Sequence, residues 1–398
     1  MKSKRNIGIM FAISLLQGMI FYGPIATLYR QSAGITVFQI TIIESISLAL
    51  CLLLELPWGI IADKIGYKKT MIFCCGLYVV SKFVFWRATN FTGFLVERIM
   101  LSVVISGLSG VNYSILYLSC SEKQSQKVFG IYNTLQTIGL LFASTIYSVF
   151  IGENYRLCGL FTVFSYSIAA LLSLALKDVG KEKEKENAFP RGFFTLLKHY
   201  LSNKYLLLFL LSVALLNETH QTITVFLNQL QYVKSGLSNN SIGYIYVGVT
   251  IIGLFGVFSS TLTRKLGVLP FAIVLFIGAI VACGTLTLTN NPWLSILAIS
   301  LLRLAFSLFE PLQMDLQNKL VVSSNRATEL SIYAVFIESV GIGTNLIFGK
   351  LSDTNLSLAM ALGTVFCSLG LIMFLIWYKK SGGYFNDKQE VNIRTTKA

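Results

Sequence analysis

The sequence predicts an all-α membrane protein with twelve transmembrane helices, arranged as two pseudo-symmetric bundles of six. Three observations support this prediction: an unusually apolar composition, twelve long apolar runs, and an alignment of the two halves at one constant offset. Of the 398 residues, 54% are hydrophobic and only 13% are charged. A soluble domain carries roughly 25% charged residues. The composition therefore indicates a chain that spans a membrane many times.

The apolar runs are each long enough to cross a bilayer, which takes about 20 helical residues. The first run follows a basic N-terminus, as in a signal sequence, but it continues to Tyr29 without a convincing cleavage site, so we expect it to be retained. The runs lie near residues 7–29, 39–62, 70–88, 92–120, 127–151, 156–177, 204–232, 239–263, 268–289, 292–320, 328–349 and 356–378.

The net charge of +14 has a simple explanation in a membrane protein, because basic residues mark cytoplasmic loops. With the N-terminus inside, most of the 32 Lys and Arg residues fall in cytoplasmic segments. We therefore expect both termini in the cytoplasm, a bacterial plasma membrane as the location, and no nucleic-acid partner. The seven cysteines show no metal-binding or CxxC spacing, so we interpret them as packing residues.

The longest polar interruption divides the chain into two halves. We predict an N-terminal bundle over 1–177, a cytoplasmic linker over 178–203, a C-terminal bundle over 204–380 and a cytoplasmic tail over 381–398. Residues Phe193 to Leu201 of the linker could form a short amphipathic helix on the inner membrane surface.

A shift of 201 residues aligns the two halves. It pairs Gly66 with Gly267, Asn90 with Asn291, Ile131-Tyr132 with Ile332-Tyr333, Gln17 with Glu218, and Asn112 with Gln313. Two parallel six-span repeats are typical of transporters, which bind substrate between the halves near the middle of the membrane.

The stretch GIIADKIGYKK resembles the loop 2–3 signature of the major facilitator superfamily. The matching residues are Gly59, Asp63, Lys64, Gly66 and Lys68, while Tyr67 stands where the family usually has a basic residue. YRLCGLF at the start of span six and NRATELSIY at the start of span eleven extend the resemblance over essentially the whole chain. The resemblance implies a secondary transporter that works by alternating access, similar to drug and small-molecule exporters.

Asp63 is the unusual residue of this signature. It sits at the C-terminal end of a helix, where the helix dipole disfavours a carboxylate, so it needs a positive partner. The resemblance implies a gating role, in which the motif braces spans two and eleven on the cytoplasmic side of the outward-open state. The second half keeps Arg264, Lys265 and Gly267 but lacks the aspartate. Simple anchoring by the positive-inside rule would explain the lysines but not Asp63.

Ionisable residues within predicted spans are functional candidates, because an ionised group in the membrane costs at least a few kcal/mol. Glu218, Glu310 and Glu338 are candidate proton carriers, since a carboxylate in a partly dehydrated cavity can exchange a proton with either side. Arg303 lies seven residues before Glu310, on the same helix face. The alternative is that Arg303 permanently neutralises one glutamate. Arg98 can snorkel outward or pair with Glu97 or Glu44.

Substrate contacts are expected from spans one, four, seven and ten, which the resemblance implies line the cavity. His220 is also compatible with an ordinary packing role. The polar candidates are Gln17, Tyr22, Asn112, Tyr113, His220, Gln221 and Gln313.

The sequence contains no nucleotide-binding loop, HExxH motif or nucleophile elbow, so we expect neither an enzyme nor an ATP-driven pump. We expect no cofactor and no metal, and a monomer that uses protons. The first hypothesis is proton-coupled efflux of a small amphipathic molecule, although span five lacks the Gly-Pro motif of many drug–proton antiporters. The alternatives are proton-coupled uptake of a polar nutrient and a non-transporting membrane sensor.

Overall fold

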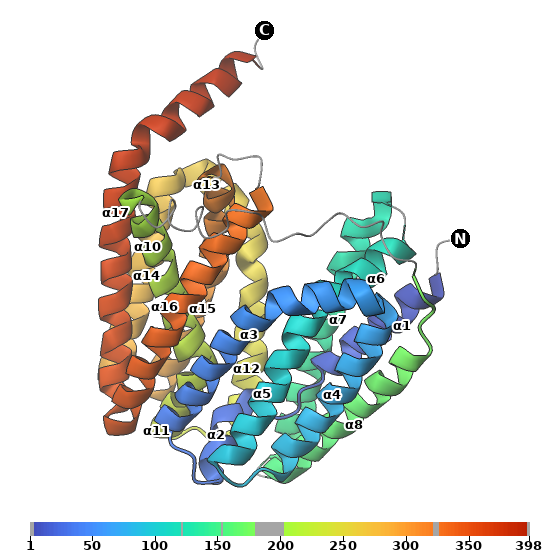
Figure 1. Ribbon diagram of the computed structural model, residues 1–398. Coiled ribbons are helices and arrows are strands. Elements are labelled where there is room, and N and C mark those ends of the chain that lie inside the picture. The colour runs from blue at the N-terminus through green and yellow to red at the C-terminus, as the bar shows by residue number, and fades with distance from the viewer. Residues whose placement is uncertain (1–3, 121, 153, 180–202, 321–325, 396–398) are drawn as a thin grey trace. The chain divides into compact units, whose positions relative to one another are not determined.

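A computed structural model describes residues 4–120, 122–152, 154–179, 203–320 and 326–395 (Figure 1). In these ranges the chain is helical without strands, and twelve helices are long and apolar enough to cross a membrane. The prediction of twelve spans is therefore confirmed. The predicted amphipathic helix from Phe193 to Leu201 lies outside the described residues.

The first six spans contain several helical pieces, because spans one and four are interrupted and span five ends in a π-helical turn. In chain order they are α1 (Lys4–Gly18), η1 (Gly23–Ile25), α2 (Ala26–Ser32), α3 (Val37–Ile65), α4 (Tyr67–Arg87), α5 (Phe91–Leu108), α6 (Val111–Ser119), α7 (Glu122–Ile146), η2 (Tyr147–Ile151) and α8 (Tyr155–Leu174).

Two of the remaining six spans also contain irregular turns: span seven has a π-helical turn and span eight has a 3₁₀ turn. They are α10 (Lys204–Gln221), η3 (Thr222–Leu227), α11 (Asn228–Lys234), α12 (Asn239–Gly253), η4 (Leu254–Phe258), α13 (Ser259–Leu266), α14 (Val268–Leu288), α15 (Pro292–Leu320), α16 (Arg326–Thr354) and α17 (Leu356–Thr395).

The chain forms two compact units. The first comprises residues 1–188, 229–250 and 345–354, and the second comprises residues 189–228, 251–344 and 355–398. The first unit thus includes two segments from the second half of the sequence. The predicted division into 1–177 and 204–380 stays a prediction.

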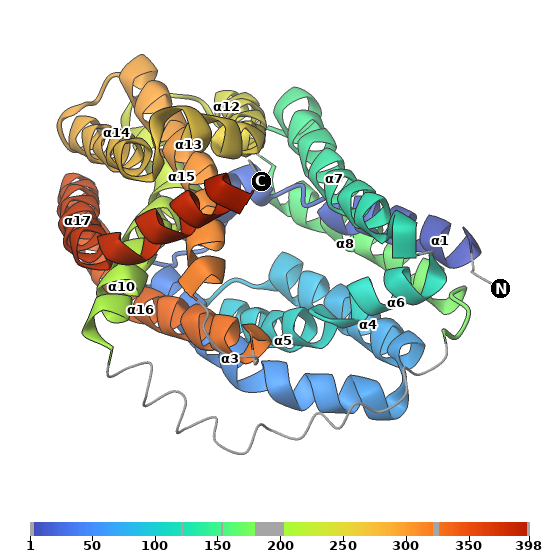
Figure 2. The same cartoon turned by 90° about the horizontal axis from the view of Figure 1, so that it is seen from above.

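In the first unit, α4 packs between α5 and α8, while α3 lies along α5 (Figure 2). Small residues permit these close approaches, as is usual where lipid provides no hydrophobic driving force between helices. An added methyl group at Gly107 of α5 would lie 2.7 Å from Cys74 Sγ and 3.2 Å from the Trp58 ring. The core therefore depends on contact between helix backbones and neighbouring side chains.

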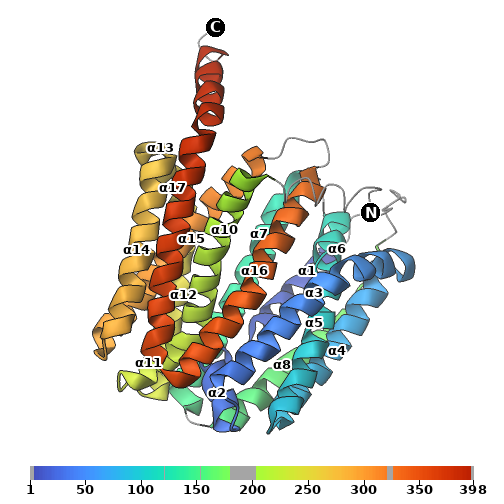
Figure 3. The same ribbon diagram turned by 60° about the vertical axis from the view of Figure 1, so that its left-hand side comes forward.

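In the second unit, α17 runs alongside α14 and α10, and α14 also packs on α15 (Figure 3). An aromatic cluster fills the space between these helices, with Phe209 and Trp377 rings 4.4 Å apart and Phe276 and Phe309 rings 5.3 Å apart. These rings are fully or almost fully buried.

The 201-residue offset pairs positions with the same backbone role. Gly66 (φ 95°) and Gly267 (φ 83°) each lie between two helices in a conformation that L side chains rarely adopt. The side chains of Asn90 and Asn291 each accept backbone N–H groups at the start of a helix. These pairs agree with the pseudo-symmetry predicted from the sequence.

Candidate functional site

Span one is broken between Gly18 and Gly23, and the polar groups released by the break are satisfied by α8. Ser165 donates to the carbonyl of Leu16 (2.5 Å) and Tyr166 donates to that of Gln17 (2.6 Å). The N–H of Phe21 donates to Thr162 Oγ1 (3.1 Å). Inside a membrane such a break is tolerated only where the protein supplies partners, and discontinuous helices frequently mark binding sites.

Glu44 of α3 bridges two arginines within the first unit. Arg30 Nη1 lies 3.2 Å from Glu44 Oε1, and Arg98 Nη2 pairs with Glu44 Oε2. Exposure is only 6% for the Arg30 and Glu44 side chains and 24% for Arg98. Of the alternatives predicted for Arg98, pairing with Glu44 is thus confirmed.

A second buried ion pair joins α4 to α5. Lys82 Nζ lies 3.6 Å from Glu97 Oε1 and donates to Tyr22 Oη at 3.0 Å. The rings of Tyr22, Tyr78 and Tyr166 surround this ammonium at 5.4–5.7 Å, within the range of cation–π attraction. Neither carboxylate oxygen of Glu97 has a hydrogen bond within the described part of the chain.

Lys82 is not among the site residues predicted from the sequence. The available signal was a lysine in the middle of an apolar run, which is rare without a partner. Its partners outside α4 come from α5, from α8 and from the break in span one, so their convergence is visible only in the fold.

In the second unit, Glu218 of α10 lies directly against α16. An added methyl group at Gly341 would come within 2.6 Å of the Glu218 carboxyl carbon. Glu338, one turn before Gly341, interacts electrostatically with Glu218. The structure therefore brings together two of the three glutamates that the sequence selected.

His220 lies on the same helix as Glu218 and packs against α15. Its ring stacks on Phe306 with centroids 3.8 Å apart, and its Nε2 lies 3.2 Å from Arg303 Nη1 and 3.0 Å from Thr224 Oγ1. Because a guanidinium can only donate, Nε2 accepts from Arg303. Arg303 also lies against Gly253, where a methyl group would be 2.5 Å from its Nη2.

The other candidates lie in varied surroundings. Gln17 is buried, with Nε2 3.5 Å from Cys75 Sγ, and Gln221 is exposed. Asn112 Oδ1 and Gln313 Oε1 are buried without hydrogen-bond partners in the described ranges. Glu310 is exposed.

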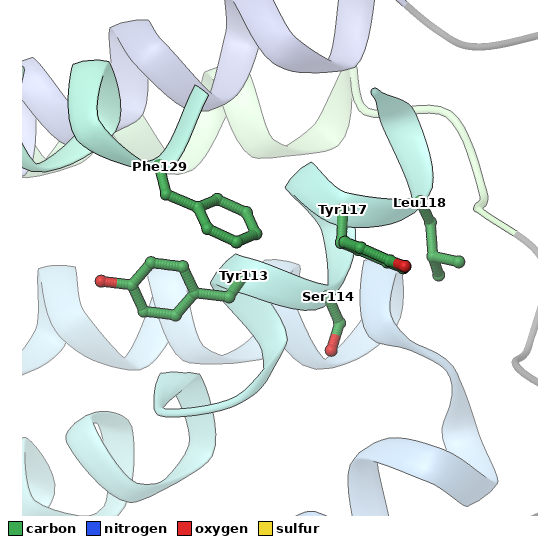
Figure 4. A pocket seen from close by; sticks show the side chains of 5 residues that line it. All are labelled: Tyr113, Ser114, Tyr117, Leu118 and Phe129. Carbon is green, nitrogen blue, oxygen red and sulfur yellow. The ribbon is translucent and has the colours of Figure 1, made fainter. Parts of the chain in front are cut away.

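Tyr113 lines a small aromatic pocket of the first unit (Figure 4). The pocket has a volume of about 230 Å³, and Tyr113 donates to Asn133 Oδ1 at 3.0 Å. The volume is below the roughly 300–1,000 Å³ usual for drug-sized ligands. The lining residues are Tyr113, Ser114, Tyr117, Leu118 and Phe129.

The signature residues of loop 2–3 surround the end of α3. Gly59 and Asp63 belong to α3, but the Asp63 side chain lies outside the described residues. Lys64 is in the last turn, and Gly66 with its positive φ separates α3 from α4, which carries Lys68. The gating role of these residues stays a prediction. Among the described residues, no group of three His, Cys, Asp or Glu side chains could hold a metal ion.

Replacing Gly341 by alanine should loosen the contact between α10 and α16. The methyl group must displace the Glu218 carboxyl group, and we expect a cost of about 1 kcal/mol, at the low end for overpacking, because this group is the flexible end of its side chain. Gly343→Ala is the matched control, because a methyl group there meets no described atom within 4 Å. We expect Gly341→Ala to unfold at a lower temperature than Gly343→Ala in the same detergent. Equal unfolding temperatures would contradict this contact.

Comparison with known proteins identifies the family of this chain and solved structures with a similar fold. The profile of the Major Facilitator Superfamily matches residues 7–343. An uncharacterized MFS-type transporter of Methanocaldococcus jannaschii is 23% identical over 212 residues, which cover 51% of this chain and 54% of the relative. The chain thus spans about half the length of this curated relative.

Solved structures of transporters share the fold over nearly the whole chain. A mutant of the nucleoside transporter NupG superposes with a TM-score of 0.80 at 15% identity, covering 94% of this chain and 100% of that one. A bacterial homologue of the human lysosomal transporter Spinster gives a TM-score of 0.73 at 14% identity, covering 95% and 98%.

Proposed function

We propose that this chain, which belongs to the Major Facilitator Superfamily, is a secondary active transporter that exports a small amphipathic molecule in exchange for protons. A multi-pass membrane transporter for a small molecule follows from the family and the fold. Proton coupling, the amphipathic substrate and export are the parts that we propose.

The position of Glu218 against the backbone of α16 at Gly341, one turn after Glu338, is the observation that supports proton coupling. Glu218 lies in the middle of span seven and packs on the backbone of α16 at Gly341. Two ionised carboxylates in a partly dehydrated site repel each other, and uptake of one proton relieves the repulsion. A site that holds one proton can release it when a substrate binds nearby.

Arg303 and His220 would transmit the binding of substrate to the protonation of the two glutamates. Arg303 is hydrogen-bonded to His220, two residues after Glu218 on α10. A substrate that contacts His220 or Gln221 would therefore alter the electrostatic surroundings of the glutamate pair. Gln313 carries an unsatisfied buried oxygen that a substrate donor could also use.

The broken part of span one would supply further substrate contacts, through Gln17 and Tyr22. Tyr22 stacks on Phe85 with ring centroids 4.0 Å apart and accepts from Lys82. Both rings are buried, and an aromatic pair beside a buried charge would suit an amphipathic molecule that reaches it. Asn112 and Tyr113 of α6 are the remaining candidates in the first unit.

The orientation that we propose has both termini in the cytoplasm of a bacterial plasma membrane, with the protein acting as a monomer. Lys64 and Lys68 then lie on the cytoplasmic side, in agreement with the positive-inside rule. Gly59, Asp63 and Gly66 would form the cytoplasmic gate of the alternating-access cycle.

The direction of transport is tested in membrane vesicles of defined orientation. A screen of small amphipathic and polar compounds first selects a ligand that raises the unfolding temperature of the purified protein. Export in exchange for protons predicts accumulation of this ligand in inverted vesicles that are acidic inside. Accumulation in right-side-out vesicles under an inward proton gradient would instead support uptake. Absence of gradient-driven flux in both would support the sensor hypothesis.

A further inference from the structure

One ring nitrogen of His220 in α10 has no hydrogen-bond partner in the described part of the chain. Nε2 lies 3.2 Å from Arg303 Nη1 and 3.0 Å from Thr224 Oγ1, whereas Nδ1 has no such neighbour there. The residue is only 1% exposed. Because an unpaired buried polar group lowers stability, most such groups in folded proteins have a partner. Nδ1 is therefore a candidate contact for a bound molecule.

The contact with Arg303 determines which ring nitrogen carries the proton. A guanidinium has only donors, so Nε2 must accept its hydrogen bond and cannot carry a hydrogen itself. Both the other neutral tautomer and the imidazolium would place an N–H on Nε2, directed at the N–H groups of Arg303. The neutral ring therefore carries its proton on Nδ1. The nitrogen of His220 that lacks a partner is a donor, and it requires an acceptor.

Two contacts within the second unit fix the positions of Arg303 and His220. A methyl group added at Gly253 of α12 would lie 2.5 Å from Arg303 Nη2 and 2.8 Å from its Nε, so a larger residue there would displace the guanidinium. The His220 ring stacks on Phe306 of α15, with centroids 3.8 Å apart and planes inclined by only 6°. The direction of the Nδ1–H bond is therefore set before any molecule binds, which reduces the ordering cost of binding.

We propose that Arg303 is a positioning residue that holds the proton of His220 on Nδ1, and that this N–H donates a hydrogen bond to an oxygen of the transported molecule. The oxygen belongs to a carbonyl or a carboxylate group. The hydrogen bond from the cationic Arg303 to Nε2 polarises the ring and strengthens its donor. An ammonium group, which has donors only, does not fit this position. The inference rests on the proposed function, because it adds a substrate class to the same transporter.

The competing interpretation is that His220 is an ordinary packing residue between α10 and α15. His220 is occluded in this structure, as a transporter site is when it is closed to both sides. However, Arg303 and Phe306, which contact its edge and its face, are only partly buried. The π-helical turn η3 follows directly after Gln221, and such turns are frequent at functional sites. The two interpretations differ in whether Nδ1–H responds to a molecule with an oxygen acceptor.

Nuclear magnetic resonance of the ring nitrogens separates the two interpretations. The chain contains only two histidines, so isotope labelling of histidine in the full-length protein, in lipid nanodiscs, gives two sets of signals. The other histidine, His199, lies outside the described residues, and His199→Gln identifies the signals of His220. The signals distinguish a protonated from an unprotonated ring nitrogen. We expect the proton of His220 on Nδ1 in the wild type.

Gly253→Ala tests the positioning role of Arg303 without changing any charge. The methyl group moves the guanidinium away from Nε2, which can then carry the proton and donate to Thr224 Oγ1. We expect both Gly253→Ala and Arg303→Met to increase the fraction of His220 that is protonated on Nε2. Gly248→Ala is the matched control on the same helix, because a methyl group there meets no described atom within 4 Å.

Three probes test the hydrogen bond to an oxygen: acetophenone, benzoate and benzylamine. They share an aromatic ring and offer a carbonyl oxygen, carboxylate oxygens and an ammonium group, respectively. We expect acetophenone or benzoate to shift the Nδ1–H signal, and benzylamine to leave it in place. The more effective of the two identifies the group as a carbonyl or a carboxylate.

Two substitutions of His220 separate its donor from its acceptor. His220→Gln keeps an acceptor for Arg303 but has no donor at the position of Nδ1, so it should weaken binding of the effective probe about tenfold. His220→Asn places an amide N–H near the position of Nδ1, so binding should weaken by no more than about threefold. Equal affinities of these two variants would contradict a hydrogen bond from Nδ1.

The proposal is wrong if neither acetophenone nor benzoate shifts the Nδ1–H signal, or if benzylamine shifts it equally. It is also wrong if the wild type carries the proton on Nε2, or if neither Gly253→Ala nor Arg303→Met changes the tautomer. No flux is measured in these experiments. A response to the probes in a protein without gradient-driven flux would therefore overturn the proposed function and leave the hydrogen bond supported, whereas flux without a response would overturn only the hydrogen bond.

Discussion

Glu218→Gln should abolish proton-driven accumulation of the ligand while the protein remains folded. Glutamine has nearly the shape of glutamate but carries no titratable proton at this position. It also removes the repulsion with Glu338, so the free energy of unfolding should change by no more than about 1 kcal/mol. Exchange of labelled for unlabelled ligand, which needs no net proton movement, should continue. The measurement compares both fluxes in the same proteoliposomes.

Glu310→Gln is the matched control for this prediction. Glu310 also lies within a transmembrane helix, α15, but its side chain is exposed. We expect gradient-driven flux in this variant to stay close to that of the wild type. If Glu218→Gln, Glu338→Gln and Glu310→Gln all retained full gradient-dependent transport, proton coupling through these carboxylates would be refuted.

Glu44→Gln should be the most destabilising of the substitutions considered. It leaves Arg30 and Arg98 facing each other without the carboxylate that joins them, and the Arg30 side chain is only 6% exposed. Removing one partner of a buried ion pair costs about 3–5 kcal/mol. The midpoint of thermal unfolding in detergent is the measurement, and we expect it to fall clearly below that of the wild type.

Glu55→Gln is the control for this substitution, because Glu55 lies on the same helix but is exposed. Its unfolding midpoint should be close to that of the wild type. If Glu44→Gln and Glu55→Gln unfolded at the same temperature, the bridge between Arg30 and Arg98 would not contribute to the stability of the first unit.

The twelve spans were predictable because the apolar runs have the length that a bilayer requires. The repeat was predictable for a different reason, since Gly66 and Gly267 are needed for the same positive-φ turn. The break in span one was not predictable. It is stabilised by hydroxyl groups of α8 about 150 residues away, and the local sequence around Gly18 does not indicate these partners.

The candidate site was predictable in part. Glu218 and Glu338 were selected because each is an acid within an apolar run, and the structure brings them together. Glu310 was grouped with Arg303 by heptad spacing, yet it is exposed while Arg303 contacts His220. Seven residues fall short of two helical turns by only about 20°, so the spacing places Arg303 and Glu310 on one face but does not tell which neighbour each of them meets.

Two other features depend on contacts between distant segments. The Lys82–Glu97 pair joins α4 to α5. The hydrophobic periodicity of these two helices does not specify which of their sides face each other. Asp353 of α16 accepts the backbone N–H groups of Val37 and Phe38 at the start of α3, and the sequence does not indicate that these segments, more than 300 residues apart, are in contact.

Proton release on ligand binding tests the exchange of protons for substrate most directly. The purified protein is mixed with the ligand selected by thermal stabilisation, in weakly buffered solution with a pH indicator. We predict that the wild type releases protons when it binds the ligand, and that Glu218→Gln binds it without release. Binding by the wild type with no proton release, or equal release by Glu218→Gln, would contradict coupling through this glutamate.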